Sequence, residues 1–257
     1  MKSNRRELLR THAFGLAVTL TAAFGIAVLL ILLVSDEPAD ALYYFFIGPF
    51  TSRYAVGTML NTAIPLIFTG LGIAVAFTSS NFNLGGEGQI YTGALLTTAV
   101  CLAIPQGNGL LVGLLALLAG IAGGALLAGL SGFLQMKWGT NLLISTFLIS
   151  SAVVLIINYL ITGPMDDPAS SLLATPAVGG QFRLSALLPP SKLDISLLFG
   201  VLTAIGIFIL VYYTHWGYEM RMCGLNSEFA RYGGIRISSF IIVPMLISGA
   251  LHGAGGG

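Results

Sequence analysis

The sequence predicts an all-α protein, a polytopic bundle of about seven transmembrane helices with a cytoplasmic N-terminus. Three observations lead to this fold class. Hydrophobic residues make up 56% of the chain and charged residues only 8%, which is too few charges to cover a surface that faces water. Apolar runs of about 20 residues recur, the length that crosses a bilayer core of about 30 Å. The 33 glycines suit close approach between membrane helices.

The first apolar run, 12–34, follows a basic tail at 1–11. The apolar region of a cleaved signal peptide is shorter, about 7–15 residues. No small-residue cleavage pattern precedes Ser35. We therefore expect this run to be retained as the first membrane span.

The remaining spans follow from apolar runs separated by polar or glycine-rich segments. The seven expected spans cover 12–34, 54–78, 88–104, 109–133, 141–162, 193–215 and 238–257. The third is short and directly follows a polar, glycine-rich segment, a pattern typical of a broken helix. The chain is interpreted as one transmembrane domain over 1–257, and its end inside the last apolar run suggests a C-terminal truncation.

Orientation follows from Lys and Arg, which accumulate in cytoplasmic loops. With the N-terminus inside, eight of these residues are cytoplasmic and three external. The cytoplasmic set is Lys2, Arg5, Arg6, Arg10, Lys137, Arg221, Arg231 and Arg236, and the external set is Arg53, Arg183 and Lys192. This bias predicts external loops at 35–53 and 163–192 and a cytoplasmic loop at 216–237.

The polar stretch 217–235 lies between two strongly apolar runs and is nineteen residues long. A loop that only reverses the chain can be much shorter. It contains Arg221, Arg231 and two acids, and it spaces Glu219 and Phe229 among other residues as a short amphipathic helix does. We expect this segment to be a structured element that docks a partner on the aqueous side.

A second informative segment, 79–94, places polar side chains beside an apolar run, with three glycines that allow the backbone to bend. The polar residues are Asn81, Asn83, Glu87 and Gln89, and the glycines are Gly85, Gly86 and Gly88. Non-helical backbone at membrane depth survives only inside protein or along a wet cavity. Two interpretations stay open: a broken helix that lines a translocation path, and a cytoplasmic loop capped by polar residues.

No segment has the pattern of an enzyme site, a P-loop or a metal-ligand cluster. Cys101 and Cys223 are interpreted as packing residues. Mid-helix Ser and Thr, including Thr146 and Ser150, are expected to bond their own backbone or join helices. Asn61 and Asn158 are further candidates for a pathway lining. His252 lies within the last span, where a functional role and a hydrogen bond across a helix contact are both open.

Three segments together resemble one family. The run from Pro65 to Phe77 leads into Asn-Leu-Gly-Gly-Glu-Gly-Gln at 83–89, the polar stretch 217–235 follows, and Ser-Gly-Ala begins at Ser248. In this order and spacing they resemble the permease subunit of bacterial ABC importers of the ribose and branched-chain amino acid type, in the branch for simple sugars and nucleosides. The resemblance covers residues from about 40 to the end.

The resemblance implies that 217–235 is a coupling helix seated on a cytoplasmic ATPase. The residues carried over to that role are Gly217, Glu219, Arg221, Gly224, Asn226, Ala230, Gly233, Gly234 and Ile235. The residues expected along the substrate path are Asn61, Asn83, Glu87, Gln89 and Asn158. The chain departs from the family pattern at Leu142, Ser150 and His252, and the family continues for several spans beyond Gly257.

The expected partners are a second permease subunit, identical or different, the ABC ATPase, an extracytoplasmic binding protein and the lipid bilayer, with no nucleic acid. The chain itself is not expected to be an enzyme or to hold a cofactor, because ATP is bound and hydrolysed by the ATPase. The expected location is the bacterial inner membrane, with several passes. Nucleosides or simple sugars are the favoured solutes. The alternatives are an importer of riboflavin or another small vitamin and, from a different class, an ion-coupled secondary transporter.

Overall fold

The computed structural model describes the backbone of residues 2–257 and the side chains of residues 14–257. The basic side chains of the N-terminal tail therefore lie outside the described residues. The described part is almost entirely helical and contains no strand, only an isolated bridge between Ala186 and Asp194. This confirms the predicted all-α class.

The helices follow one another with short links, except for a long irregular segment before α7. In chain order they are α1 (Lys2–Val34), α2 (Pro38–Phe46), η1 (Gly48–Phe50), α3 (Arg53–Thr78), α4 (Gly86–Ala103), α5 (Gly109–Trp138), α6 (Leu142–Thr162), η2 (Gly180–Phe182), α7 (Ser196–Tyr213), α8 (His215–Leu225), α9 (Ser227–Tyr232) and α10 (Ile237–Gly256).

Six helices of the described chain are long and apolar enough to span a membrane. They contain the segments Phe14–Val34, Arg53–Thr78, Gly109–Trp138, Leu142–Thr162, Ser196–Tyr213 and Ile237–Gly256. The remaining predicted span, the third, is α4, which forms as a helix but carries Glu87 and Gln89 in its first turns and is less apolar. The chain is therefore a multi-pass membrane protein.

The chain divides into two compact units, one of residues 1–59 with 188–191 and one of residues 60–187 with 192–257. In the first unit, α1 contacts α2 through Phe24 and Phe46, whose ring centroids are 6.0 Å apart. Helix α2 exposes Tyr43, Tyr44 and Phe45. Aromatic side chains of this kind are enriched where a membrane meets water.

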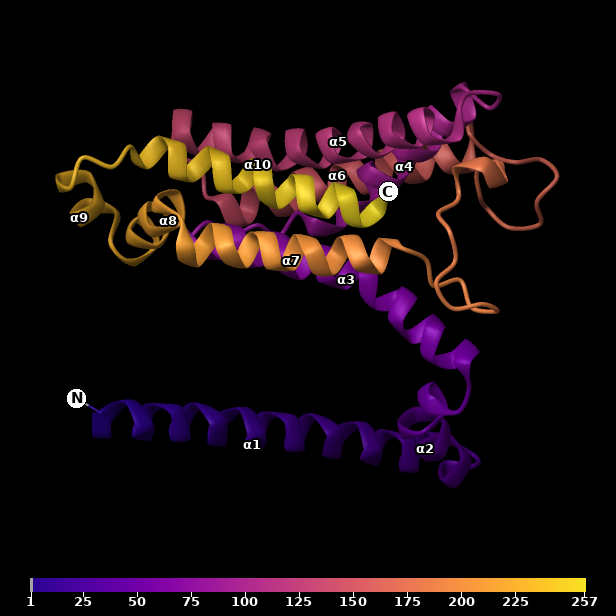
Figure 1. Ribbon diagram of the computed structural model, residues 1–257, viewed down its shortest axis with the longest axis horizontal. Helices are drawn as coiled ribbons and strands as arrows, with labels where there is room; N and C mark the ends of the chain where they lie inside the picture. The colour runs from indigo at the N-terminus through magenta and orange to yellow at the C-terminus, as the bar shows by residue number, and fades with distance from the viewer. Residues whose placement is uncertain (1) are drawn as a thin grey trace. The chain divides into compact units, whose positions relative to one another are not determined.

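The second unit is built around α4, α5, α6 and α10, which pack side by side (Figure 1). Small residues bring α5 and α10 together: a Cβ on Gly124 would lie 2.2 Å from the carbonyl oxygen of Gly249, and the reverse contact is equally short. Only glycine permits this approach, because no real Cβ contact is so close. Backbone contact of this kind is a usual basis of helix association in membranes.

The segments that connect the helices of the second unit lie at its two ends. Side chains of the α3–α4 link, the C-terminal turn of α5 and the α8–α9 junction border one hollow of about 460 Å³. At the other end, the Gln181 side chain donates to the carbonyl oxygen of Pro105 at 2.6 Å, joining the long irregular segment to the α4–α5 turn. The loop 216–237, predicted to be cytoplasmic, thus lies with the α3–α4 link, and the segment 163–192, predicted to be external, lies with the α4–α5 turn.

Candidate functional site

Residues 79–85 form a non-helical link between α3 and α4, which agrees with both interpretations of this segment. The Asn81 side chain is buried, and its amide donates to the Phe240 carbonyl oxygen at 2.7 Å and to Ser79 Oγ at 2.9 Å. The link is thereby fixed to the first turn of α10. Pro244, four residues after Phe240 in α10, has no N–H, so the Asn81 amide supplies the donor that the Phe240 carbonyl oxygen lacks within its own helix.

Asn83, Gln89 and Ser248 form a closed set of hydrogen bonds, which we call the amide cluster. Asn83 Nδ2 donates to Gln89 Oε1 at 3.0 Å and to Ser248 Oγ at 2.9 Å, while Gln89 Nε2 donates to Asn83 Oδ1 at 3.0 Å. The Gly85 amide also donates to Asn83 Oδ1, at 2.9 Å. Asn83 and Gln89 are 2% and 3% exposed, so the amide cluster joins α4 to α10 inside the protein.

Two hydroxyls of α6 complete the start of α4. Thr146 Oγ1 accepts from the Leu84 amide at 3.1 Å, and Ser150 Oγ accepts from the Gly88 amide at 2.8 Å. Thr146 also donates to the Leu142 carbonyl oxygen of its own helix at 2.7 Å. Both interpretations of mid-helix hydroxyls, back-bonding and helix joining, therefore apply to this one residue. The bonds from Thr146 and Ser150 to the start of α4 could not be predicted from the sequence, because nothing in it pairs α6 with α4.

Glu87 lies between the residues of this bonded network but faces the other way. Its side chain is exposed, and it forms no ion pair with any residue whose side chain the structure describes. Together with Tyr91, one turn later, it borders a cavity between α3, α4 and α10. The structure thus brings Asn83, Glu87 and Gln89 together at the start of α4. Asn61 on α3 and Asn158 on an exposed face of α6 have no place in the bonded network.

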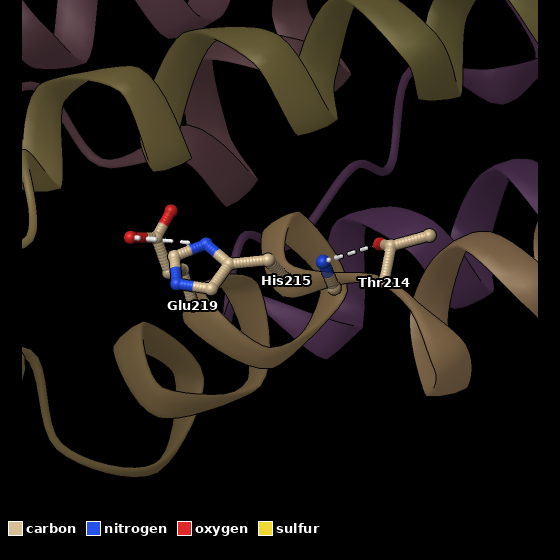
Figure 2. Close-up of polar contacts among 4 residues, drawn as sticks. Thr214, His215 and Glu219 are labelled. Atoms are coloured by element: carbon tan, nitrogen blue, oxygen red, sulfur yellow. Dashed lines mark hydrogen bonds and ion pairs between the residues drawn. The ribbon is translucent and has the colours of Figure 1, made fainter.

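At the other functional region, the predicted single amphipathic helix is two helices, α8 and α9. Thr214 begins α8: its hydroxyl oxygen accepts from the Gly217 amide at 3.0 Å, and His215 approaches Glu219 at 3.7 Å (Figure 2). The Arg221 guanidinium donates to the Val211 carbonyl oxygen at the end of α7. Arg221 therefore fastens α8 to the membrane helix before it.

The end of α8 is fastened to the α3–α4 link. Ser80 Oγ donates to the Gly224 carbonyl oxygen at 2.8 Å. A Cβ on Gly224 would lie 2.2 Å from the Thr78 carbonyl oxygen, so only glycine permits this contact. Cys223 is buried next to it, and burial, with a smaller contribution from Glu219, raises the pKa of its thiol. A neutral, enclosed thiol suits the packing role predicted for it.

Asn226 separates the two helices because its backbone is extended, and its side chain accepts from the Phe229 amide at 2.9 Å to begin α9. Ala230 is buried and its carbonyl oxygen accepts from the Ile235 amide at 3.1 Å. Between them, Gly233 ends α9 and Gly234 adopts a positive φ of 84°, which favours glycine.

The outer surface of this element exposes large apolar and aromatic side chains beside the charged side chains of Glu228 and Arg231. Leu225, Phe229 and Tyr232 are 82%, 62% and 90% exposed. Exposed apolar side chains that gather on a polar loop are candidates for an interaction surface. The inner side of the element is tied to α3 and α7, and its outer side is open.

No group of three or more metal-ligating side chains occurs among the residues that the structure describes.

Comparison with known proteins gives a consistent family. Residues 55–257 match the model described as the permease component of branched-chain amino acid transport systems. A probable riboflavin import permease protein, RfuC, of Treponema pallidum is 34% identical over 90% of this chain and 62% of its own length. A glucose ABC transporter permease protein, TsgB13, of Haloferax volcanii is 28% identical over 98% of this chain and 69% of its own.

A guanosine ABC transporter permease protein, NupP, of Bacillus subtilis is 28% identical over 88% of this chain and 66% of its own length. The chain spans between 62% and 69% of the length of these three relatives. No solved structure matches the chain.

Proposed function

The chain belongs to the family of permease components of branched-chain amino acid transport systems, and we propose that it forms the membrane path of an ATP-driven importer for a neutral polar solute. Nucleosides or simple sugars are the favoured solutes. Relatives named for guanosine, nucleoside and glucose transport support this choice.

The observation that carries the proposal is the element of α8 and α9. It is fastened to α7 through Arg221 and to the α3–α4 link through Ser80 and Gly224, while Phe229 and Tyr232 project from it. A partner that moves α9 would therefore displace the link at the start of α4. We assign α9 as the surface on which a cytoplasmic ABC ATPase docks.

In this proposal the chain has no catalytic residue, and ATP is bound and hydrolysed by the ATPase. A second permease subunit completes the path, and an extracytoplasmic binding protein delivers the solute. The bacterial inner membrane is the expected location. An ion-coupled carrier would need paired acids or bases within the membrane, and Glu87 and His252 are the two candidates within the described spans and α4.

A second candidate solute is riboflavin or another small vitamin. It is favoured by the relative that matches at 34% identity, whose name states riboflavin import. The two candidates share a neutral solute with many hydrogen-bonding groups, and they differ in the size of the ring system.

The proposal is tested by exchanging the exposed aromatic residues of α9. Phe229→Asp and Tyr232→Asp place charges in the docking surface without touching the bonded inner side. The matched control is Leu172→Asp in the irregular segment before α7, where the side chain is 75% exposed, between the 62% of Phe229 and the 90% of Tyr232.

We expect both α9 variants to lose co-purification with the ATPase of the same transport system and to abolish uptake of guanosine or riboflavin. The Leu172 variant is expected to retain both. If the α9 variants still bind the ATPase and sustain uptake, the assignment of α9 is wrong.

A further inference from the structure

The first turns of α10, residues 237–243, precede a proline inside the helix, Pro244. Proline has no N–H, so the carbonyl oxygen of Phe240, four residues earlier, receives no hydrogen bond from its own helix. Prolines within helices are also the usual sites of bends. Residues 237–243, which we call the leading turns, are therefore joined to the rest of α10 more weakly than a continuous helix would join them.

Beyond Pro244, α10 lies in backbone contact with α5. A Cβ on Gly253 would be 2.3 Å from the Gly120 carbonyl oxygen, a distance that only glycine permits. In the leading turns the two helices are less close. A Cβ on Gly132 would be 3.5 Å from Ile242 Cα, which is an ordinary contact distance. The tight and the loose parts of this helix pair thus meet near the proline.

Phe240 is held by two elements outside its own helix. Its carbonyl oxygen accepts from the Asn81 amide of the α3–α4 link at 2.7 Å, and the same amide donates to the Ile241 carbonyl oxygen at 3.4 Å. Its ring packs against Trp216 of α8, with the ring centroids 5.4 Å apart. The leading turns are therefore bound to the link and to α8 at the residue whose bond to its own helix the proline removes.

Asn81 is also tied closely to α8. It directly follows Ser80, whose hydroxyl donates to the Gly224 carbonyl oxygen at the end of α8 at 2.8 Å. Ser80 adopts a φ of 56°, in the left-handed region that residues with a side chain rarely occupy. The Asn81 backbone amide donates to the Ala76 carbonyl oxygen at 3.0 Å. Because adjacent residues of one tight turn bond α8 and α10, a displacement of α8 is passed directly to Phe240.

The leading turns also lie beside free space. Ile237, Phe240 and Ile241 border the hollow of about 460 Å³, which Gln135 of α5 also borders. Protein interiors are otherwise close-packed. A helix segment beside a hollow therefore shifts with less repacking than a segment in full contact.

We propose that Asn81 and Trp216 are positioning residues of the transport cycle. They hold the leading turns to α8 and to the α3–α4 link, so that these turns move with α8 about Pro244 while the rest of α10 stays on α5. The inference rests on the proposed docking of an ATPase at α9, which supplies the displacement. It adds the place where that displacement enters a membrane helix.

The test follows two distances by pulsed electron paramagnetic resonance in the complex with its ATPase, reconstituted in lipid nanodiscs. Spin labels on Tyr218→Cys in α8 and on Ser238→Cys in the leading turns are each paired with a label on Leu114→Cys in α5. All three positions are exposed, whereas the native Cys101 and Cys223 are buried. Between the nucleotide-free and the vanadate-trapped complex, both distances are expected to change by about 2 Å or more.

The contacts with Phe240 are tested by combining Asn81→Ala with Trp216→Leu. We expect the Tyr218 distance to change as before, the Ser238 distance to stay constant, and the ATPase to co-purify. Uptake of guanosine or riboflavin should fall about tenfold or more, the usual size of a coupling between sites. A merely structural role would lower the melting temperature and leave both distances changing together.

The matched control for the loss of an asparagine side chain is Asn141→Ala. That side chain accepts from the Leu143 and Ile144 amides of its own helix, α6. Both distance changes and uptake should remain as in the unaltered chain.

Pro244→Ala tests the pivot in a chain that is expected to fold, because it restores a backbone N–H for the Phe240 carbonyl oxygen. With α8 still bound to a helix that no longer pivots, neither distance should change, and uptake should fall about tenfold or more. The matched control is Pro65→Ala, which exchanges the proline inside α3 in the half of that helix remote from the link. It should behave as the unaltered chain.

The inference is overturned if the Ser238 distance is constant in the unaltered complex, or if it still changes in the folded Asn81→Ala/Trp216→Leu chain. It is also overturned if Pro244→Ala leaves both changes intact, and this variant decides alone if the double variant does not fold. The α9 variants report separately on docking of the ATPase. Loss of the ATPase in those variants, with a constant Ser238 distance in the unaltered complex, would sustain the docking surface and overturn the positioning role.

Discussion

The first turns of α4 face two regions that treat polar groups in opposite ways. In the amide cluster, Asn83 and Gln89 are buried and bond each other and Ser248. At the cavity, Glu87 is exposed and forms no ion pair with a described side chain, and His252 is buried with no partner for Nε2 among the described residues. Gln89 and Glu87 are two positions apart on α4, yet Gln89 is held in the amide cluster and Glu87 is exposed. A buried polar side chain is therefore not by itself a binding group. Where all its hydrogen bonds are made within the protein, as in the amide cluster, its first role is to hold helices together.

The largest effect is expected from opening the amide cluster. Asn83→Leu removes the partners of both Gln89 polar atoms, of the Gly85 amide and of Ser248. We expect the free energy of unfolding to fall by about 2–4 kcal/mol, because several buried groups lose hydrogen bonds. Unfolding by denaturing detergent, followed by circular dichroism, measures it.

Asn158→Leu is the matched control, since it makes the same exchange on an exposed face of α6. Equal losses for the two variants would mean that the amide cluster contributes nothing specific.

A smaller effect is expected where α3 meets His252. A Cβ on Gly72 would lie 2.8 Å from His252 Cε1 and 2.9 Å from the Ser248 carbonyl oxygen. Gly72→Ala should therefore destabilise the protein by about 1–3 kcal/mol through overpacking. In the same unfolding assay, Gly70→Ala should show no loss, because nothing lies within 4 Å of its Cβ. A neutral Gly72→Ala would show that the imidazole moves aside freely.

The hydroxyls of α6 are expected to contribute less. Thr146→Val and Ser150→Ala each remove one acceptor for an amide at the start of α4. Hydrogen bonds between membrane helices contribute about 0.6 kcal/mol on average, with a maximum near 1.7. We expect each variant to lose an amount in that range, measured by the same unfolding titration. Ser151→Ala, whose hydroxyl donates to Phe147 on its own helix, serves as the comparison.

The smallest effect on stability is expected at the cavity. Glu87→Leu removes an exposed carboxylate that forms no ion pair in the described structure, so the unfolding midpoint should not fall. A thermal melt of the purified variant measures this. A marked loss of stability would mean that Glu87, like Asn83 of the amide cluster, holds the helices together, and the two regions would then not differ.

Much of the fold could be predicted from composition and spacing. The apolar runs gave the spans, and the segment 79–85 is the predicted break between two helices. The α8–α9 element was predicted as one helix, because Asn226 acts as a helix start only through its backbone and its bond to the Phe229 amide. The family resemblance seen in the motifs is confirmed by the match over residues 55–257.

The candidate site could be predicted only in part. Asn83, Glu87 and Gln89 stood out as polar groups beside an apolar run, but their periodicity does not tell which face of α4 meets α6 and α10. Tyr91 had no signal at all, since it resembles an ordinary residue of a membrane helix. Hydrogen-bonding partners from segments 60 or more residues apart cannot be paired without the fold.

The sequence by itself determined that this protein lies in a membrane. A chain with 56% hydrophobic and 8% charged residues can stabilise its exposed surface only in lipid. It also determined the position of the polar element at 217–235. Only the tertiary structure decided which polar groups of α4 are bonded and which are open. The rotation of α4 is set by backbone contacts such as that between Gly93 and Gly253, and those contacts turn Gln89 inward and leave Glu87 facing the cavity.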